Sequence, residues 1–288
     1  MHPPQPAPKP PAAAPAPPAA PAPVAPPVTA LPPAPPEVAP PPAPVPAVPA
    51  WRRNAAAFTP VPGRPMIALV IDDMGVDVRR SAEAMALPPA ATLSFLAYAR
   101  DVARQSAAAR ARGHELLLHL PMEPLDRSAD PGPGALLTAM SRETIVATLR
   151  RDLAAFSGYV GVNNHMGSRF TASAEAMTPV LEEFKADGLL FLDSLTSGRS
   201  VGAKLAESLG VPTLKRDVFI DDSPDPGAIR TQLARAEAIA KRTGRVVMIG
   251  HPRDGTLAAL RAWMPAAEAA GFQFVPLSAL VRAKSGGR

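Results

Sequence analysis

The sequence predicts an α/β fold, a closed or nearly closed barrel of parallel strands that follows an extended spacer. From about residue 64, apolar runs of strand length alternate with segments of helical periodicity, which is typical of parallel βαβ construction. Before that point, the first fifty residues hold 23 of the 39 prolines and only two charged side chains, Lys9 and Glu37. Such a segment cannot build a packed core, because proline removes backbone donors and fixes φ. We therefore expect a disordered Pro/Ala-rich spacer over 1–63 and one domain over 64–288.

Eight strands are predicted along this domain, each a short apolar run bounded by polar or turn residues. They cover residues 66–71, 91–95, 115–120, 160–163, 189–192, part of 213–220, 245–249 and 273–275. Three helix candidates between them have clear start and stop signals, a capping side chain at one end and a glycine at the other. They begin at Ser141, Ser173 and Asp225 and end at Gly158, Gly188 and Gly244.

Composition excludes several classes of function. The chain has no cysteine, so a disulfide framework and a Cys-based zinc site or nucleophile are impossible, and any metal site must use His, Asp or Glu. The net charge is +5, but the arginines and lysines are scattered without aromatic interleaving, so no nucleic-acid partner is expected. Attraction to anionic envelope polymers or lipid headgroups fits the charge equally well.

No export signal and no run of about 18 apolar residues is visible in the sequence. A long Pro/Ala spacer nevertheless often separates an anchor from a domain. We expect a periplasmic or cell-envelope location, with a membrane tether only through an N-terminal segment missing from this sequence.

Unusual polar residues stand where the predicted strands end. They are Asp72 and Asp73, His119, the run Asn163, Asn164 and His165, then Asp193, Asp221, Asp222 and His251. In parallel α/β folds the carboxyl ends of the strands form the face where ligands bind. Taken singly, adjacent aspartates are more often a helix cap, and a lone histidine or a Gly-His-Pro turn is more often structural.

Taken together, these groups are hard to explain by capping, because burying them without compensation is expensive. A divalent cation would let both aspartates stay ionised, with neutral imidazoles completing the nitrogen and oxygen shell that zinc and similar metals favour. Such a site supports a metal-activated water that attacks a carbonyl or phosphoryl centre. One aspartate would bind the metal and the other would act as base.

Six ordered motifs carry a resemblance to a known family. "IALVIDDMG", "GHELLLHLPMEP", "GVNNHMGSRFT", "LLFLDSLTS", "KRDVFIDD" and "MIGHP" closely resemble the divergent polysaccharide deacetylase family, the YibQ-like proteins, over residues of about 65 to 280. That family is related to the NodB-type carbohydrate esterases. The resemblance implies a distorted (β/α) barrel of the glycoside hydrolase/deacetylase type. It also implies removal of N- or O-acetyl groups from glycans by a metal-activated water.

The resemblance also implies roles for individual residues. Asp72 resembles the catalytic base of those esterases, Asp73 its metal-binding partner, and His119 the first histidine of their second motif. Their second histidine is replaced by Glu123, a less certain ligand, and His165 is expected to take its place on the metal. His251 resembles the general acid, Asn164 is a candidate for stabilising the oxyanion, and the arginine that orients the base in those enzymes is absent. The metal is expected to be zinc.

Two functions of different classes follow. The first is a metal-dependent carbohydrate esterase, a deacetylase acting on C–N or ester bonds of an envelope glycan such as peptidoglycan or another acetylated polysaccharide. The alternative is a catalytically weak or inactive barrel that binds a glycan or a protein in the cell envelope. Phosphoester hydrolysis and a serine esterase are less favoured, because the chain has neither a GxxxxGK[ST] loop nor a G-x-S-x-G elbow.

Overall fold

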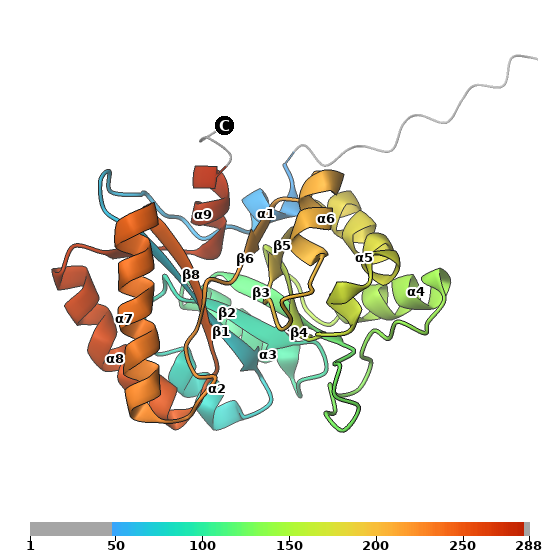
Figure 1. Cartoon of the computed structure of the whole chain (residues 1–288), viewed down its shortest axis with the longest axis horizontal. Coiled ribbons are helices and arrows are strands. Elements are labelled where there is room, and N and C mark those ends of the chain that lie inside the picture. The colour runs from blue at the N-terminus through green and yellow to red at the C-terminus, as the bar shows by residue number, and fades with distance from the viewer. Residues whose placement is uncertain (1–47, 285–288) are drawn as a thin grey trace, which may run out of the picture. The chain divides into compact units, whose positions relative to one another are not determined.

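A computed structural model describes residues 48–284, where a curled sheet of nine parallel strands forms the centre of the domain (Figure 1). The sheet order is β6-β5-β4-β3-β2-β1-β8-β7, with β9 beside β1. The strands are β1 (Met66–Met74), β2 (Thr92–Leu96), β3 (Leu116–Met122), β4 (Gly161–Met166), β5 (Leu190–Asp193), β6 (Thr213–Lys215), β7 (Val218–Phe219), β8 (Arg245–Gly250) and β9 (Gln273–Phe274). The predicted class, a distorted parallel (β/α) barrel, is confirmed.

The closure of the barrel differs from the expected ring of eight strands. The segment predicted as one strand within 213–220 splits into β6, which pairs with β5, and β7, which pairs with β8. Between them, the Arg216 N–H donates to the Asp193 carbonyl at 3.0 Å and the Asp217 N–H to the Val247 carbonyl at 2.8 Å. One divided strand therefore bridges the two edges of the sheet. The last predicted strand is the two-residue β9, which pairs only with the start of β1.

Helices follow most of the strands. They are α1 (Ala50–Arg53), α2 (Val78–Ala84), α3 (Val102–Ala111), α4 (Arg142–Leu153), α5 (Ala174–Ala186), α6 (Gly202–Leu209), α7 (Pro226–Thr243), α8 (Asp254–Ala269) and α9 (Leu277–Lys284), with a 3₁₀ turn at Phe170–Ala172. The three predicted caps are present: Ser141, Ser173 and Asp225 each accept a hydrogen bond from a backbone N–H in the first turn of the helix that follows. Among residues 48–284, none of these helices combines the length and apolar composition needed to cross a bilayer.

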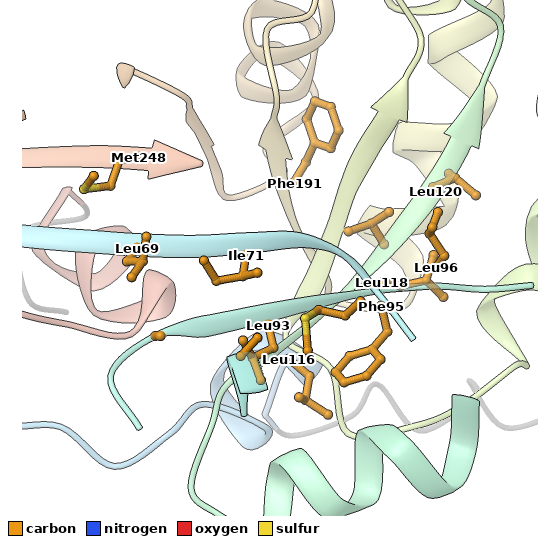
Figure 2. Close-up of a cluster of buried hydrophobic side chains, with 14 of the residues drawn as sticks. Leu69, Ile71, Leu93, Phe95, Leu96, Leu116, Leu118, Leu120, Phe191 and Met248 are labelled. Atoms are coloured by element: carbon orange, nitrogen blue, oxygen red, sulfur yellow. The ribbon is translucent and has the colours of Figure 1, made fainter. Parts of the chain in front are cut away.

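Alternating residues of the strands supply two hydrophobic clusters, one on each face of the sheet. In β1, Leu69 and Ile71 join the cluster that packs under the surrounding helices (Figure 2), whereas Ala68 and Val70 join the other. Because both faces are buried, the strands are almost continuously apolar, as is typical of parallel sheets. Most polar side chains of the sheet thus stand toward the strand ends, although Ser94 and His119 lie within β2 and β3.

The packed domain begins before residue 64, where the sequence analysis places its boundary. Trp51 of α1 is 4% exposed and belongs to the second cluster, together with Val160 and Leu190. Its backbone N–H donates to the Gly188 carbonyl at 2.9 Å. A large aromatic ring buried in this way anchors α1 to the barrel. Residues 1–47 of the expected spacer lie outside the described part of the chain.

Candidate metal centre

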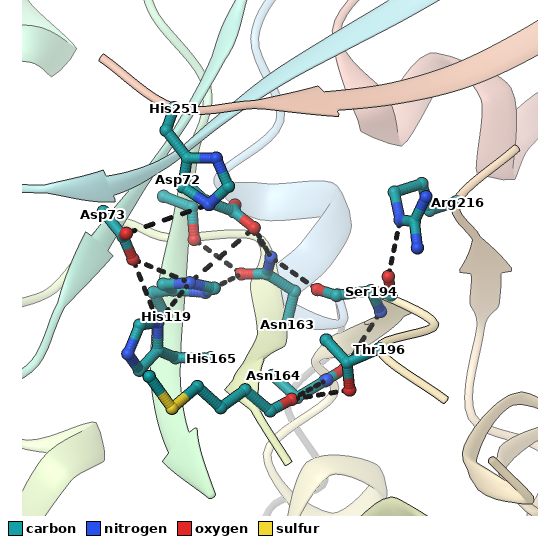
Figure 3. A network of polar contacts seen from close by, with 12 residues as sticks. Asp72, Asp73, His119, Asn163, Asn164, His165, Ser194, Thr196, Arg216 and His251 are labelled. Carbon is teal, nitrogen blue, oxygen red and sulfur yellow. Dashed lines mark hydrogen bonds and ion pairs between the residues drawn. The ribbon is translucent and has the colours of Figure 1, made fainter. Parts of the chain in front are cut away.

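The end of β1 turns two adjacent carboxylates toward one site. Successive side chains of a regular strand point to opposite faces of the sheet. Here the register with β2 shifts between Ile71 and Met74, and Asp73 adopts a left-handed conformation with φ of 55°. This bulge lets the side chains of Asp72 and Asp73 both reach the carboxyl end of the barrel (Figure 3).

Three side chains from three strands bring one ligand atom each into a small triangle (Figure 3). Asp73 Oδ1 lies 2.9 Å from His165 Nδ1 and 3.3 Å from His119 Nε2, and the two imidazole nitrogens are 3.2 Å apart. Asp73 Oδ1 is buried and has no hydrogen-bond partner in the described part of the chain. A buried oxygen left in this state is costly unless something positive faces it.

The triangle fits a divalent cation. Ligand atoms about 2.1 Å from a zinc ion lie about 3.4 Å apart in a tetrahedral site, close to the spacing found here. One carboxylate and two imidazoles are also a donor set that zinc accepts. Burial by itself favours the protonated acid, but the contacts with His119 and His165 hold the pKa of Asp73 well below its ordinary value, so the carboxylate is ready to bind.

Asp72 lies beside this triangle but outside it. Its side chain is 3% exposed, and its Oδ2 is 3.7 Å from His119 Nε2. Burial raises the pKa of Asp72, although His119, His251 and the amide of Asn163 oppose the shift. A carboxylate with a raised pKa accepts a proton more readily at neutral pH, which is the property of a general base.

Asn163 connects Asp72 with His119. Its fully buried amide nitrogen donates to both Asp72 oxygens and to Ser194 Oγ, which leaves Oδ1 as an acceptor. His119 Nδ1 lies 3.0 Å from that oxygen. The bond places the proton of His119 on Nδ1 and frees Nε2 for a metal. The sequence analysis gave Asn163 no role, but period-two alternation along β4 puts it on the same face as His165.

His251 forms a pair with Asp221. Its Nδ1 lies 2.9 Å from Asp221 Oδ1, and its backbone N–H donates to Asp221 Oδ2, which also accepts from Thr256 Oγ1. Nε2 of His251 faces the metal centre, 3.8 Å from Asp73 Oδ2. Burial lowers the pKa of His251, but the bond and charge of Asp221 outweigh it, so the pKa is raised. The sequence analysis identified Asp221 only as an aspartate at a strand end. It did not predict the pair, because Asp221 and His251 are 30 positions apart in the chain.

The structure corrects the expectation that Glu123 binds the metal. Its carboxylate accepts hydrogen bonds from the backbone N–H and hydroxyl of Thr138, at 2.7 and 2.6 Å, and pairs with Arg169. It therefore ties two loops together and is not part of the ligand triangle. The spacing of four residues after His119 does not bring it to the site, because β3 ends at Met122 and the chain turns away.

Asn164, the candidate for stabilising the oxyanion, is hydrogen-bonded to neighbouring backbone groups. Its amide nitrogen donates to the Met166 carbonyl, and its oxygen accepts from the backbone N–H of Ser194. The first bond lies within the end of β4, and the second joins β4 to the residue that follows β5. Asn164 nevertheless lines the cavity beside Asp73 and His165, and its role toward the oxyanion stays a prediction.

The centre opens into a cavity of about 700 Å³. Asp72, Asp73, His119, His165 and His251 line one part of it, and Arg216, Phe219, Arg235 and Arg253 line another. The sequence analysis did not anticipate Arg216, which enters the site from the divided strand that closes the barrel. Its Nε and Nη2 each donate at 2.7 Å to a backbone carbonyl, those of Ser194 and Leu195.

A family model and known relatives match most of the described domain. The family model described as "divergent polysaccharide deacetylase" matches residues 69–281. The uncharacterized protein YibQ of Escherichia coli (strain K12) is 35% identical over 219 residues, which cover 73% of this chain and 68% of YibQ.

Two solved structures resemble the fold. The crystal structure of the uncharacterized protein ATU2773 from Agrobacterium tumefaciens C58 superposes with a TM-score of 0.79 at 32% identity, covering 82% of this chain and 97% of that one. The catalytic domain of peptidoglycan N-acetylglucosamine deacetylase from Eubacterium rectale superposes with a TM-score of 0.50 at 17% identity, covering 78% and 94%. At that identity the second match shows a shared fold alone.

Proposed function

The chain belongs to the divergent polysaccharide deacetylase family, and on that premise we propose that it is a metal-dependent hydrolase that removes acetyl groups from a cell-envelope glycan. One observation carries the proposal: a triangle of ligand atoms, a buried carboxylate with a raised pKa and a His–Asp pair all meet at one cavity. These are the groups that hydrolysis of an amide or ester by an activated water requires.

Asp73, His119 and His165 would hold the metal, and their donor set favours zinc. The ion would supply Lewis acidity, lowering the pKa of a water and polarising the carbonyl of the acetyl group. Asn163 fixes the orientation and the tautomer of His119, so this ligand needs no rearrangement before binding.

Asp72 would act as the general base. As the water oxygen adds to the acetyl carbonyl carbon, the carboxylate takes the proton of that water. Its burial raises the pKa toward the range where proton transfer is effective. The two bonds from Asn163 hold the carboxylate in place without removing the lone pairs that face the cavity.

His251 would act as the general acid. When the C–N bond breaks, Nε2 gives its proton to the leaving amine, and acetate and the free amine are the products. Asp221 accepts from Nδ1 and stabilises the imidazolium, so that the proton is available at neutral pH. The glycan substrate is supported by the family to which the chain belongs, and the envelope location is part of the proposal.

The test measures metal content and acetate release with the full-length chain. We expect about one zinc per chain by elemental analysis, and release of acetate from N-acetylglucosamine oligomers or peptidoglycan. The Asp72→Asn variant should keep its metal, because Asp72 lies outside the triangle, and should lose acetate release by about two to four orders of magnitude.

Glu123→Gln is the matched control, a carboxylate change of equal size next to the site that should retain both metal and activity. Metal-loaded wild-type protein that releases no acetate from any of these substrates would refute the proposal. Full activity in Asp72→Asn would refute the role of the base. An inactive wild type that still binds the glycan would support the binding-module alternative.

A further inference from the structure

The metal centre occupies only part of the cavity, and the opposite wall has a different chemistry. That wall comes from the link between β6 and β7, from β7 itself, from α7 and from the residue before α8. It presents Arg216, Phe219, Arg235 and Arg253. None of these side chains takes part in the proposed hydrolysis. Two carboxylates outside the metal centre, Asp217 and Asp222, line the same cavity, so three guanidinium groups face two negative charges there.

Arg216 is held rigidly. Its two backbone acceptors, the carbonyls of Ser194 and Leu195, use two of its five N–H donors, and its guanidinium lies 4.9 Å above the Phe219 ring. The remaining donors are available to a ligand. Since an arginine fixed in advance loses little side-chain entropy on binding, it is well suited to recognise a planar or tetrahedral anion.

Arg235 approaches the same place from α7. It makes no hydrogen bond and no ion pair with any residue in the range 48–284. Both arginines line the same cavity. Burial lowers the pKa of Arg216, the charges of Asp72, Asp222 and Asp193 oppose that shift, and the positive charge of Arg235 adds to it. Two neighbouring guanidinium groups in a cleft are stabilised when an anion lies between them.

Phe219 links the arginines of this wall to His251. Its ring centroid is 5.5 Å from that of His251, the proposed general acid, and the Arg216 guanidinium lies on the same ring. The leaving amine belongs to a sugar that must sit next to His251. A substituent on that sugar or on its neighbour therefore lies near the arginines.

We infer that Arg216 and Arg235 form a subsite for an anionic group, so that the glycan recognised here carries a carboxylate or a phosphate close to its acetylated sugar. The inference rests on the proposed function for the identity of the ligand as a glycan. Arg253, whose Nη1 donates to the Asp221 carbonyl at 2.6 Å, borders the subsite and adds to its positive potential.

Direct binding to EDTA-treated full-length protein tests this inference by titration calorimetry. The carboxylate probe is a hyaluronan tetrasaccharide, compared with neutral tetra-N-acetylchitotetraose. The phosphate probe is N-acetylglucosamine 6-phosphate, compared with N-acetylglucosamine. We expect at least one anionic probe to bind about tenfold more tightly than its neutral counterpart, the size of effect that one charge-assisted contact gives. The arm that shows the preference identifies the anion.

Arg235→Gln should reduce this preference at least about fivefold while leaving the neutral probe unaffected. Arg230→Gln is the matched control, since Arg230 lies on the same helix but lines a separate groove with Trp263, and it should keep the full preference. Equal affinity for charged and neutral probes would overturn the inference. So would an equal loss for both kinds of probe in Arg235→Gln.

This experiment separates the subsite from the proposed function, because it reads binding without turnover. A preference for the anionic probe in a protein that never releases acetate supports the subsite and defeats the hydrolase proposal. Acetate release without any preference for charged ligands defeats the subsite alone.

Discussion

The amide nitrogen of Asn163 donates to both carboxylate oxygens of Asp72, at 2.9 and 3.0 Å, although 91 residues separate the two in the sequence (Figure 3). The same amide accepts from His119 Nδ1 through its oxygen. One side chain thus orients the proposed base and a proposed metal ligand together.

Replacing Asn163 by alanine should weaken the site and the fold together. The buried Asp72 carboxylate would lose its donor, which costs about 1–3 kcal/mol of unfolding free energy, measured by urea denaturation. Acetate release should fall about 10- to 100-fold as the ligand and base lose their orientation. Ser94→Ala is the control, because it removes only a second donor to Asn163 Oδ1 and should cost less on both measures. Equal losses in the two variants would contradict the role given to Asn163.

The ligand triangle predicts that metal binding depends on Asp73, His119 and His165. Zinc at 100 times its dissociation constant should stabilise the wild-type protein by about 2.7 kcal/mol, because it binds the folded state. His165→Ala removes one of three ligands and should lose most of that stabilisation in thermal unfolding with and without zinc. Glu123→Gln should keep it. Loss of the zinc effect in Glu123→Gln would show that the ligand set is wrong.

The His251–Asp221 pair predicts a pH dependence. The proposed acid works in its protonated form, and its raised folded-state pKa extends activity to higher pH than an ordinary imidazole would allow. Asp221→Asn removes the partner that raises the pKa, so the alkaline limb of kcat/KM should move to lower pH, with a lower maximum. Thr256→Val, which removes a different bond to Asp221, should shift the limb much less. An unchanged alkaline limb in Asp221→Asn would exclude His251 as the titrating acid.

The buried ring of Trp51 predicts where the stable domain starts. Trp51→Ala should lower the unfolding free energy by about 3–5 kcal/mol, the usual cost of removing a large aromatic side chain from a core. Arg53→Ala is the neighbouring control, since Arg53 is exposed and its bond to the Val48 carbonyl is long at 3.3 Å, and it should cost far less. A loss below about 1 kcal/mol in Trp51→Ala would place the boundary near residue 64 after all.

The sequence predicted most of the polar residues of the site but not the hydrogen bonds between them. Asp73, His119 and His165 were each predicted as ligands, and the structure brings their ligand atoms together. Glu123 has the right residue type at a plausible position, yet its carboxylate is bound by Thr138 and lies outside the ligand triangle. Arg216 and Asn163 were missed, because their contacts depend on strand pairings between segments far apart in the chain.

The sequence by itself determined the alternation of strands and helices, and with it the end of the barrel at which polar residues collect. That follows from local physics, since apolar runs form strands and parallel connections put all their carboxyl ends on one side. Only the tertiary structure decided which atoms meet there. The left-handed conformation of Asp73 turns its side chain to the same site as that of Asp72. The division of one predicted strand into β6 and β7 brings in Arg216. Both features depend on how strands far apart in the chain pair with one another, and the residue pattern of one segment does not encode that pairing.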